Sequence, residues 1–257
     1  MVRWHSLYLP SDHTVNVADA LQPLLSAAGY TPNDPFVLGA AAYDQAVRLF
    51  CAPPQDNWRR ILLEITQFTL VDDIASALAP GASVCISAWM ANGDNGGLSV
   101  YQHGQRTTLD VLDTYQTAAP PNPDLPEQKT VGNIPVDQMP EHIQKLAGKV
   151  KSNQAENMFN KVAKRFLSVD QQEAGANLID NQPNWQSETG QQIITVLSSL
   201  GITNWAQPDF ATLRGAYVLH LRRQRNPNAA LLPGDDDILQ AVPNALDYVP
   251  YYWGKEA

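Results

Sequence analysis

The sequence lacks the features that place a chain in a membrane or outside the cell. No uncharged apolar run approaches the roughly 20 residues of a transmembrane helix. The first 13 residues have no basic flank leading into an apolar stretch, as a signal peptide would. Cysteine occurs only at Cys51 and Cys85, which argues against a disulfide framework and a cysteine-rich zinc site. We therefore expect a cytoplasmic protein with no membrane partner.

Sequence motifs that identify common enzymes are also missing. There is no glycine-rich nucleotide loop, no GxSxG nucleophile elbow and no histidine pair at metal-binding spacing. Both cysteines fall in apolar predicted strands without a basic neighbour that would lower their pKa. The acidic run at residues 234–237 opens a predicted helix, where the helix dipole is a sufficient explanation. We expect neither a metal nor a cofactor.

Positive charge is scarce, and the charges are unevenly distributed. The chain carries 17 Lys and Arg against 26 Asp and Glu, a net charge of −9. Up to Gln128 there are 5 basic and 13 acidic residues, and from Lys129 onward 12 and 13. Nucleic acids and anionic membranes are bound through neutralisation of phosphate by Lys and Arg. Nucleic acid is therefore not an expected partner.

The first half of the chain alternates between strand and helix patterns. Strands are predicted where β-branched and aromatic residues cluster, and helices where apolar residues recur at helical spacing. The predicted strands are residues 3–9, 46–52, 58–65 and 83–90, the predicted helices are 17–29 and 69–79, and a hairpin turns at His103 and Gly104 between residues 98–102 and 105–112. The order β-α-β-β-α-β plus hairpin is typical of a ferredoxin-like α+β sheet.

A proline-rich stretch separates this half from a helical one. Residues 119–128 contain four prolines, which disfavour both helix and sheet. We therefore predict an α+β domain at 1–118, a linker at 119–130 and an all-α C-terminal domain at 131–257. The predicted helices of that domain are residues 139–150, 154–167, 189–200, 208–225 and 235–242. The aromatic tail after them contains a proline, and we expect it to be an extended segment that docks on the body.

Four polar residues in predicted loops or turns are the candidates for catalysis: Asp12, His13, Asp94 and His103. Histidine and carboxylate side chains are the usual acid–base groups of enzymes. Asp12 and His13 nevertheless precede a predicted helix, where such residues act as caps, and His103 lies at a predicted turn. These structural roles explain the residues unless the fold brings them into one cleft.

Two groups of residues near the C-terminus are the candidates for binding: Arg222, Arg223 and Arg225, and Tyr251, Tyr252 and Trp253. The arginines end the predicted helix at 208–225. Together with the helix at 189–200 and the connection between them, this helix resembles a helix-turn-helix. However, the connection is long and contains proline, and recognition helices read bases with their N-terminal part. Cations at a helix C-terminus are explained by the dipole. Three consecutive aromatic residues cannot all face one way.

The preferred hypothesis is a non-catalytic binding or regulatory protein that acts through protein–protein contacts, with itself or with another protein. A free sheet edge is one possible surface for self-association. The alternative is a hydrolase or transferase with a site at the domain interface, built from the four catalytic candidates. A weaker alternative is DNA binding through the helix that carries Arg222.

Overall fold

The computed structural model describes residues 2–12, 16–36, 43–55, 57–91, 94–116, 130–131, 134–135, 183–203, 205–228, 230–232 and 234–256. The chain divides into two compact units, Met1–Pro121 with Pro183–Ala257, and Asn122–Gln182. In the second unit the described residues form two short antiparallel strands, β8 (Thr130–Val131) and β9 (Ile134–Pro135). The predicted helices at 139–150 and 154–167 lie outside the described residues, as does the predicted linker apart from Thr130.

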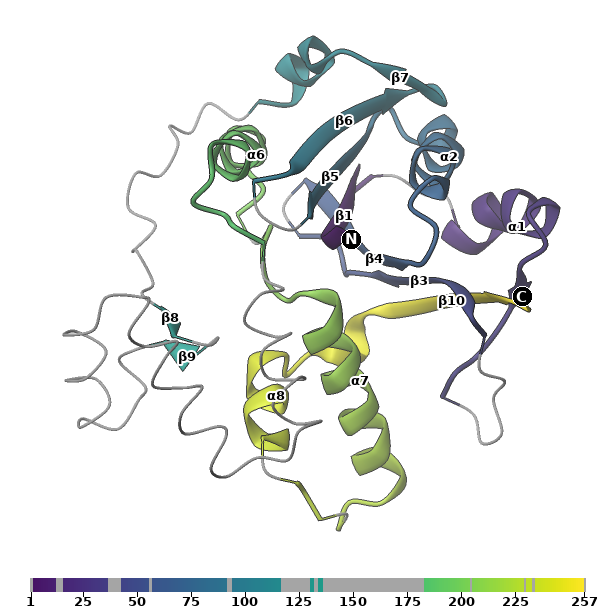
Figure 1. Cartoon of the computed structure of the whole chain (residues 1–257), viewed down its shortest axis with the longest axis vertical. Helices are drawn as coiled ribbons and strands as arrows, with labels where there is room; N and C mark the ends of the chain where they lie inside the picture. Colours follow the sequence, from purple (N-terminus) through teal and green to yellow (C-terminus); the bar gives the residue numbers. More distant parts are fainter. Residues whose placement is uncertain are drawn as a thin grey trace. The chain divides into compact units, whose positions relative to one another are not determined.

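The first unit is built on an antiparallel sheet of eight strands (Figure 1). They are β1 (Val2–Pro10), β2 (Thr31–Pro32), β3 (Gln45–Cys51), β4 (Trp58–Ile65), β5 (Cys85–Ala91), β6 (Gly96–Gln102), β7 (Gln105–Thr107) and β10 (Val249–Lys255). The order across the sheet is β2-β10-β3-β4-β1-β5-β6-β7. The four strands predicted at 3–9, 46–52, 58–65 and 83–90 are confirmed, and the fold class is α+β.

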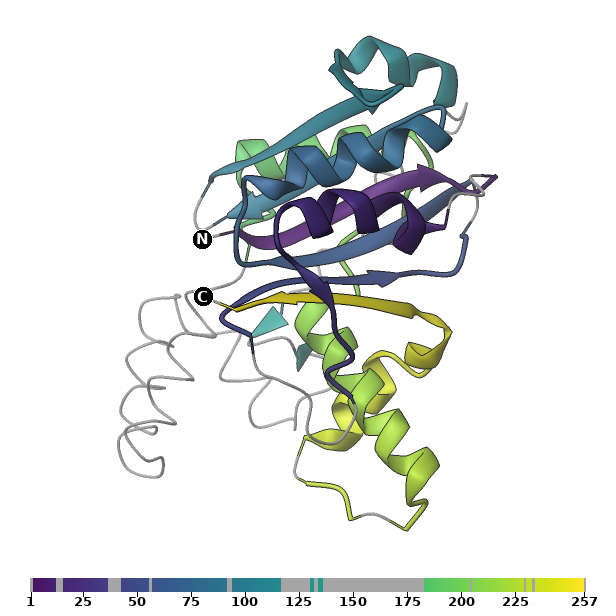
Figure 2. The same ribbon diagram turned by 90° about the vertical axis from the view of Figure 1, so that its right-hand side faces the viewer.

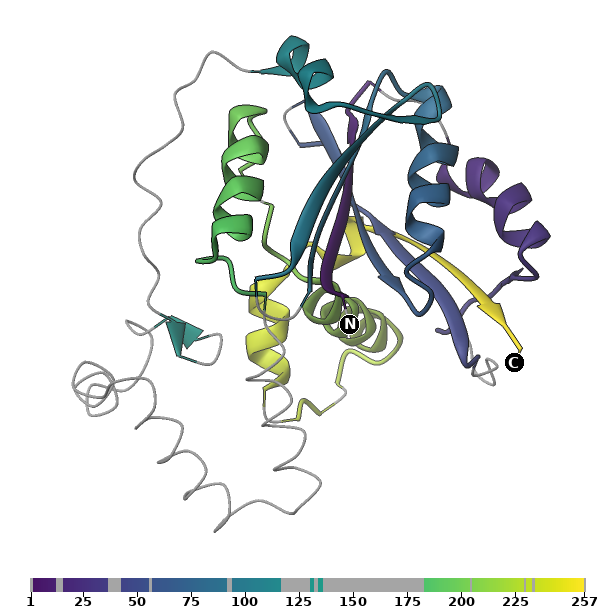
Figure 3. The same ribbon diagram turned by 45° about the horizontal axis from the view of Figure 1, so that its top comes forward.

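Helices cover both faces of this sheet (Figure 3). One face carries α1 (Val17–Ala27) and α2 (Leu70–Leu78), and the other carries α6 (Glu188–Ser199), α7 (Phe210–Arg225) and α8 (Asp235–Ala241). Short 3₁₀ helices η1 (Ala79–Gly81), η2 (Leu109–Tyr115) and η4 (Ala245–Asp247) lie between these elements. The helices predicted at 17–29, 69–79, 189–200, 208–225 and 235–242 are confirmed to within two residues at each end.

Apolar cores lie on both faces of the sheet because side chains alternate along the strands. On β1, Leu7 and Leu9 pack with α1 and α2, whereas Trp4 and Tyr8 pack on the opposite face with α6. Each of these four side chains is buried. Successive residues of a strand point to opposite faces, so a central strand between two helical layers must be apolar in both registers.

The end of the chain differs from the predicted all-α C-terminal domain. The tail is extended and docks on the body, as expected, but it does so as strand β10, which pairs with β3 along its whole length. Trp253 is buried on the α1 face and Tyr252 on the α7 face. This period-two burial of aromatic side chains stabilises a strand, and it makes residues 183–257 part of the same compact unit as the first half.

The predicted hairpin is confirmed, although its second strand is shorter than expected. His103 and Gly104 have φ of 51° and 79°, so both central residues of the turn are left-handed, as in a two-residue type I′ connection. After Thr107 the chain leaves the sheet and forms η2, whose Leu112 is buried in the core on the α6 face. β7 therefore covers only Gln105–Thr107 of the predicted second strand.

Candidate functional site

The three catalytic candidates among the described residues, Asp12, Asp94 and His103, do not line either of the two hollows described below. Asp12 is exposed in the turn after β1. His103 is exposed in the β6–β7 turn, at the same end of the strands as Asp12. Asp94 lies in the β5–β6 turn, at the other end of β6 from His103, about 20 Å away for seven strand residues. The carboxylate of Asp94 accepts a hydrogen bond of 2.9 Å from Asn184. His13 lies outside the described residues.

A buried serine–histidine pair, which the sequence analysis missed, lies beneath α2. His5 Nε2 is 3.0 Å from Ser87 Oγ, and the two side chains are 6% and 2% exposed. Burial lowers the pKa of His5 to about 3, and the opposing effect of the Asp72 carboxylate is smaller. The ring of Phe68 lies 5.8 Å from the imidazole. The pair is 82 residues apart in sequence, so only the β1–β5 pairing reveals it.

This pair has the atoms of a nucleophile and a base but not the access that catalysis needs. Neither side chain lines either of the two pockets described below. An imidazole with so low a pKa also has little affinity for the proton of a serine hydroxyl. Its evident role is to satisfy two buried polar groups and to join β1 to β5.

A second buried polar group lies on the opposite face of the sheet. Arg60 donates hydrogen bonds of 2.9 Å to Ser6 Oγ and to the Gln207 carbonyl, and its guanidinium lies 5.6 Å from the centre of the Trp4 ring. Burial lowers the pKa of this guanidinium. Through these contacts Arg60 holds the segment that precedes α7 against the sheet, and so it positions α7.

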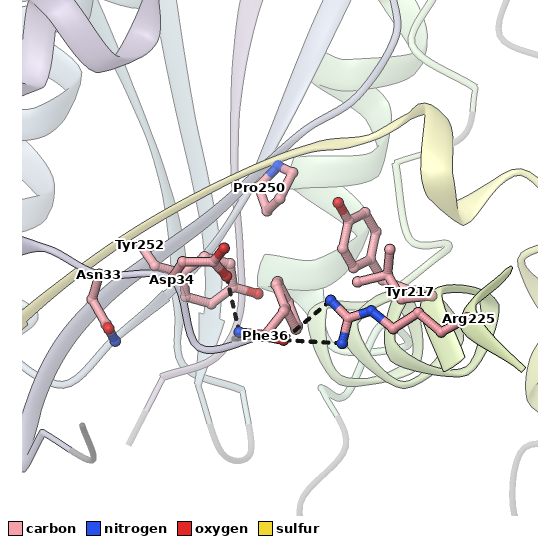
Figure 4. Close-up of a pocket in the computed structure, with 8 residues that line it drawn as sticks. Asn33, Asp34, Phe36, Tyr217, Arg225, Pro250 and Tyr252 are labelled. Carbon is pink, nitrogen blue, oxygen red and sulfur yellow. Dashed lines mark hydrogen bonds between the residues drawn. The ribbon is translucent and has the colours of Figure 1, made fainter. Parts of the chain in front are cut away.

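A hollow with polar walls lies between the outer edge of β10 and the C-terminal half of α7 (Figure 4). Its volume is about 350 Å³. Residues from three elements line it: Asn33, Asp34 and Phe36 from the segment after β2, Tyr217, Leu221 and Arg225 from α7, and Pro250 and Tyr252 from β10. We call this hollow the α7 pocket.

Hydrogen bonds and ring contacts hold the segment after β2 in place. Asp34 Oδ1 accepts a hydrogen bond of 2.9 Å from the Phe36 backbone N–H. Both terminal nitrogens of Arg225 donate to the Phe36 carbonyl at 3.4 Å (Figure 4). The Phe36 ring lies 5.1 Å from that of Tyr217 and 5.4 Å from that of Tyr252. Contacts with α7, with β10 and within the segment itself therefore fix the position of Phe36 in the wall of the α7 pocket.

The ionisation of these walls suits binding. Burial raises the pKa of Tyr217, with a further contribution from the Asp34 carboxylate, and burial also raises the pKa of Tyr252. Both phenols therefore stay protonated and can donate hydrogen bonds. The Tyr252 hydroxyl is buried and has no hydrogen-bond partner among the described residues. The pocket thus offers one cation, one anion and neutral donors, but no nucleophile–base pair.

The structure divides the predicted binding residues between surface and core. Arg222 and Arg223 are exposed on the last turn of α7, and Arg225 and Tyr252 line the α7 pocket. Trp253 is instead a core residue, and its indole Nε1 donates a 3.1 Å hydrogen bond to Gln22. Tyr251 is half-buried and stacks on Trp253 with ring centres 6.3 Å apart. For Trp253, packing rather than binding explains the aromatic side chain.

A second hollow, of about 360 Å³, lies on the opposite face of the sheet. Cys51, Arg59 and Tyr251 are among its lining residues. Burial raises the pKa of the Cys51 thiol, so this cysteine is not a thiolate nucleophile at neutral pH. Burial acts in the same direction on Cys85.

The helices that resembled a helix-turn-helix do not have its packing. α6 packs in the core with Ile86 and Val100, whereas α7 packs in a separate core with Phe50. In the N-terminal turn of α7, Phe210 and Leu213 pack against the sheet, whereas Ala211 and Arg214 are exposed. DNA binding through α7 stays a prediction.

Neither the described part of the chain nor its comparison with known proteins assigns a function. No helix there has the length and apolarity to cross a membrane. No three His, Cys, Asp or Glu side chains of the described residues come together in a group that could hold a metal ion. No protein-family model matches the sequence, and neither the curated proteins nor the solved structures contain a match to it.

Proposed function

We propose that this chain is a non-catalytic binding or regulatory protein, and that it docks an acidic segment of another protein at the α7 pocket and the adjoining arginines. The observation that carries the proposal is the convergence of Arg225 and Tyr252 on one hollow next to the exposed Arg222 and Arg223. Both groups were candidates for binding on sequence alone.

Charge supports an acidic partner. The protein has a net charge of −9, so a cluster of three arginines at one helix end is a local exception to its overall potential. Arg225 uses two donors on the Phe36 carbonyl, and a guanidinium carries five in all. Complementary charge guides association and selects among partners.

The apolar part of the pocket supports an anchoring side chain next to the acidic group. Phe36, Leu221 and Pro250 line it beside the Tyr217 and Tyr252 rings. A volume of about 350 Å³ accommodates one large side chain, and an anchor that fills a pocket contributes most of the energy in many interfaces. The expected partner segment therefore combines Asp or Glu with a Phe, Tyr or Leu.

We also propose that the centre of the sheet has the ferredoxin-like strand order. The pairing order β3-β4-β1-β5, with every neighbour antiparallel, supports a ferredoxin-like centre that is extended at both edges. The two free, buried cysteines are compatible with the reducing cytoplasm that we propose as the location.

A phage-displayed library of random peptides, panned on the purified full-length chain, tests the proposal. Selected peptides are synthesised with a fluorophore, and their affinity is measured by anisotropy. We expect peptides that join acidic and large apolar residues, with affinity about tenfold or more weaker for Arg225→Glu. The matched control is Arg59→Glu, which changes the charge equally on the other face of the sheet and should alter affinity by less than about twofold.

Three outcomes would overturn the proposal. They are a selection that enriches no peptide, peptides that bind Arg225→Glu as tightly as the unmodified chain, and duplex DNA that binds at low salt and is lost on Arg222→Glu. The last result would favour nucleic acid as the partner.

A further inference from the structure

The strand β6 begins at an asparagine–glycine junction, where the β5–β6 turn ends. Asn95 is the last residue of the turn, and Gly96 is the first residue of the strand. Figure 2 shows this end of β6 at the border of the sheet. Asn95 is exposed. Gly96 has no Cβ that would shield its backbone nitrogen, so the side chain of Asn95 can approach that nitrogen.

The backbone N–H of Gly96 has no hydrogen-bond partner among the described residues. Ala91 N–H donates a 2.7 Å hydrogen bond to the Asn95 carbonyl, so these two residues form a hydrogen-bonded pair between β5 and β6. Pairs alternate along an antiparallel ladder, so the next pair, Met90 and Gly96, directs its backbone groups away from each other. On its outer side, β6 pairs with β7 only at residues 100–102. The described part of the chain therefore leaves the Gly96 nitrogen unbound.

Packing between β5 and β6 requires glycine at this position. A Cβ at Gly96 would overlap the sulfur of Met90 and would lie 2.9 Å from the carbonyl oxygen of Trp89. Close-packed interiors do not absorb an extra carbon without shifting their neighbours, so a larger residue would disturb the strand. The fold therefore keeps an unshielded backbone nitrogen directly after Asn95.

We propose that Asn95 is a site of spontaneous deamidation. The Gly96 nitrogen gives its proton to hydroxide and attacks Cγ of Asn95, which forms a cyclic imide. The bond from Cγ to Nδ2 breaks, and ammonia leaves with a proton taken from water. Water then opens the ring at one of its two carbonyl carbons, which gives either aspartate or isoaspartate at position 95. The reaction needs only water and hydroxide, and it involves no oxidation or reduction.

The product alters the connection between β5 and β6. In isoaspartate the main chain runs through Cβ and Cγ, which adds one carbon between residues 95 and 96. The carbonyl that accepts the hydrogen bond from Ala91 then becomes a carboxylate outside the main chain. Either product adds a negative charge next to Asp94, whose carboxylate accepts a hydrogen bond from Asn184 shortly before α6. We therefore expect the modified protein to be less stable.

Incubation of the folded full-length chain in mildly alkaline buffer, followed by peptide mass spectrometry, tests the proposal. Asn92 also precedes a glycine, so every sample carries Asn92→Gln, because glutamine would have to close a larger ring. We expect Asn95 to gain the mass of a deamidated residue at a rate within about tenfold of that in the urea-unfolded chain, because the fold does not protect its nitrogen. Electron-transfer fragmentation identifies the isoaspartate. Asn57 and Asn184 both precede tryptophan and are internal controls that should not react.

A matched variant tests the effect on the fold. During the incubation the thermal midpoint of the Asn92→Gln chain should fall by about 2–4 °C, whereas the chain that also carries Asn95→Gln should keep its midpoint. Three results would overturn the proposal. They are a reaction at Asn95 more than about tenfold slower than in the unfolded chain, an equally fast reaction at Asn57 or Asn184, and an unchanged midpoint once Asn95 has reacted. None of these measurements depends on the α7 pocket.

Discussion

His5 on β1 and Ser87 on β5 form a hydrogen bond of 3.0 Å across two neighbouring strands, beneath α2. Because burial lowers the pKa of His5 to about 3, the imidazole is neutral in the folded protein at all pH values above that. In the unfolded chain the same group titrates near 6.5. The difference couples the proton to folding.

The first prediction concerns stability in acid. Between pH 6.5 and 3 the unfolded state binds a proton at His5 that the folded state does not, so stability is lost as the pH falls. The slope for one proton is about 1.4 kcal/mol per pH unit. His5→Gln should remove this contribution, measured as the difference between urea unfolding curves of the two proteins over that range. Parallel pH dependence of the two proteins would contradict the assignment.

The second prediction concerns the anchor of α7. Arg60→Met removes hydrogen bonds to Ser6 and to the Gln207 carbonyl and leaves the buried Ser6 hydroxyl without this donor. We expect a loss of about 2–4 kcal/mol in the free energy of unfolding, from urea denaturation. The neighbouring Arg59 is only half-buried, and Arg59→Met should change stability by less than about 0.5 kcal/mol. Equal effects of the two substitutions would refute the role of Arg60.

A third prediction tests the docking of the last strand. A Cβ at Gly254 would overlap the ring of Tyr43, so Gly254→Ala forces the ring or the strand to move. The expected loss is about 1–3 kcal/mol in thermal or urea unfolding. Tyr43→Ala should remove the clash, so that adding Gly254→Ala to that variant destabilises it little. Full additivity of the two substitutions would count against this contact.

The fourth prediction concerns the hydroxyl of Tyr252. It is buried and makes no hydrogen bond among the described residues, so Tyr252→Phe should leave stability unchanged or raise it by about 1 kcal/mol. Tyr252→Ala should instead cost about 3–5 kcal/mol, because the ring packs with Phe36 and Phe50. Differential scanning calorimetry distinguishes the two variants. A large loss on Tyr252→Phe would show that the hydroxyl has a partner.

Several elements could be predicted from the amino-acid sequence because their signals are local. The helix at 210–225 begins after Asp209, whose carboxylate accepts a 2.7 Å hydrogen bond from Thr212, and it ends with Arg222, Arg223 and Arg225. The turn at His103 and Gly104 lies between two strand patterns and was equally recognisable. Caps, turn residues and periodicity act over a few residues, so they can be seen without knowledge of the fold.

The position of the last strand was not visible in this way. Val249–Lys255 carries aromatic residues that suit a strand, but its place beside β3 depends on a partner about 200 residues earlier. The α7 pocket could not be predicted from the sequence either, because Asp34, Tyr217 and Pro250 come from three distant parts of the chain. Of the predicted catalytic residues, Asp94 and His103 lie at opposite ends of one strand.

Composition, capping residues and side-chain periodicity were therefore enough to establish an acidic α+β protein with two free cysteines and most of its described helices and strands. The sheet order, the buried His5–Ser87 and Arg60–Ser6 contacts and the α7 pocket were decided by tertiary structure alone. The physical reason is that each of these depends on which distant strands pair, and burial then alters the ionisation of groups such as His5 that look ordinary in the linear chain.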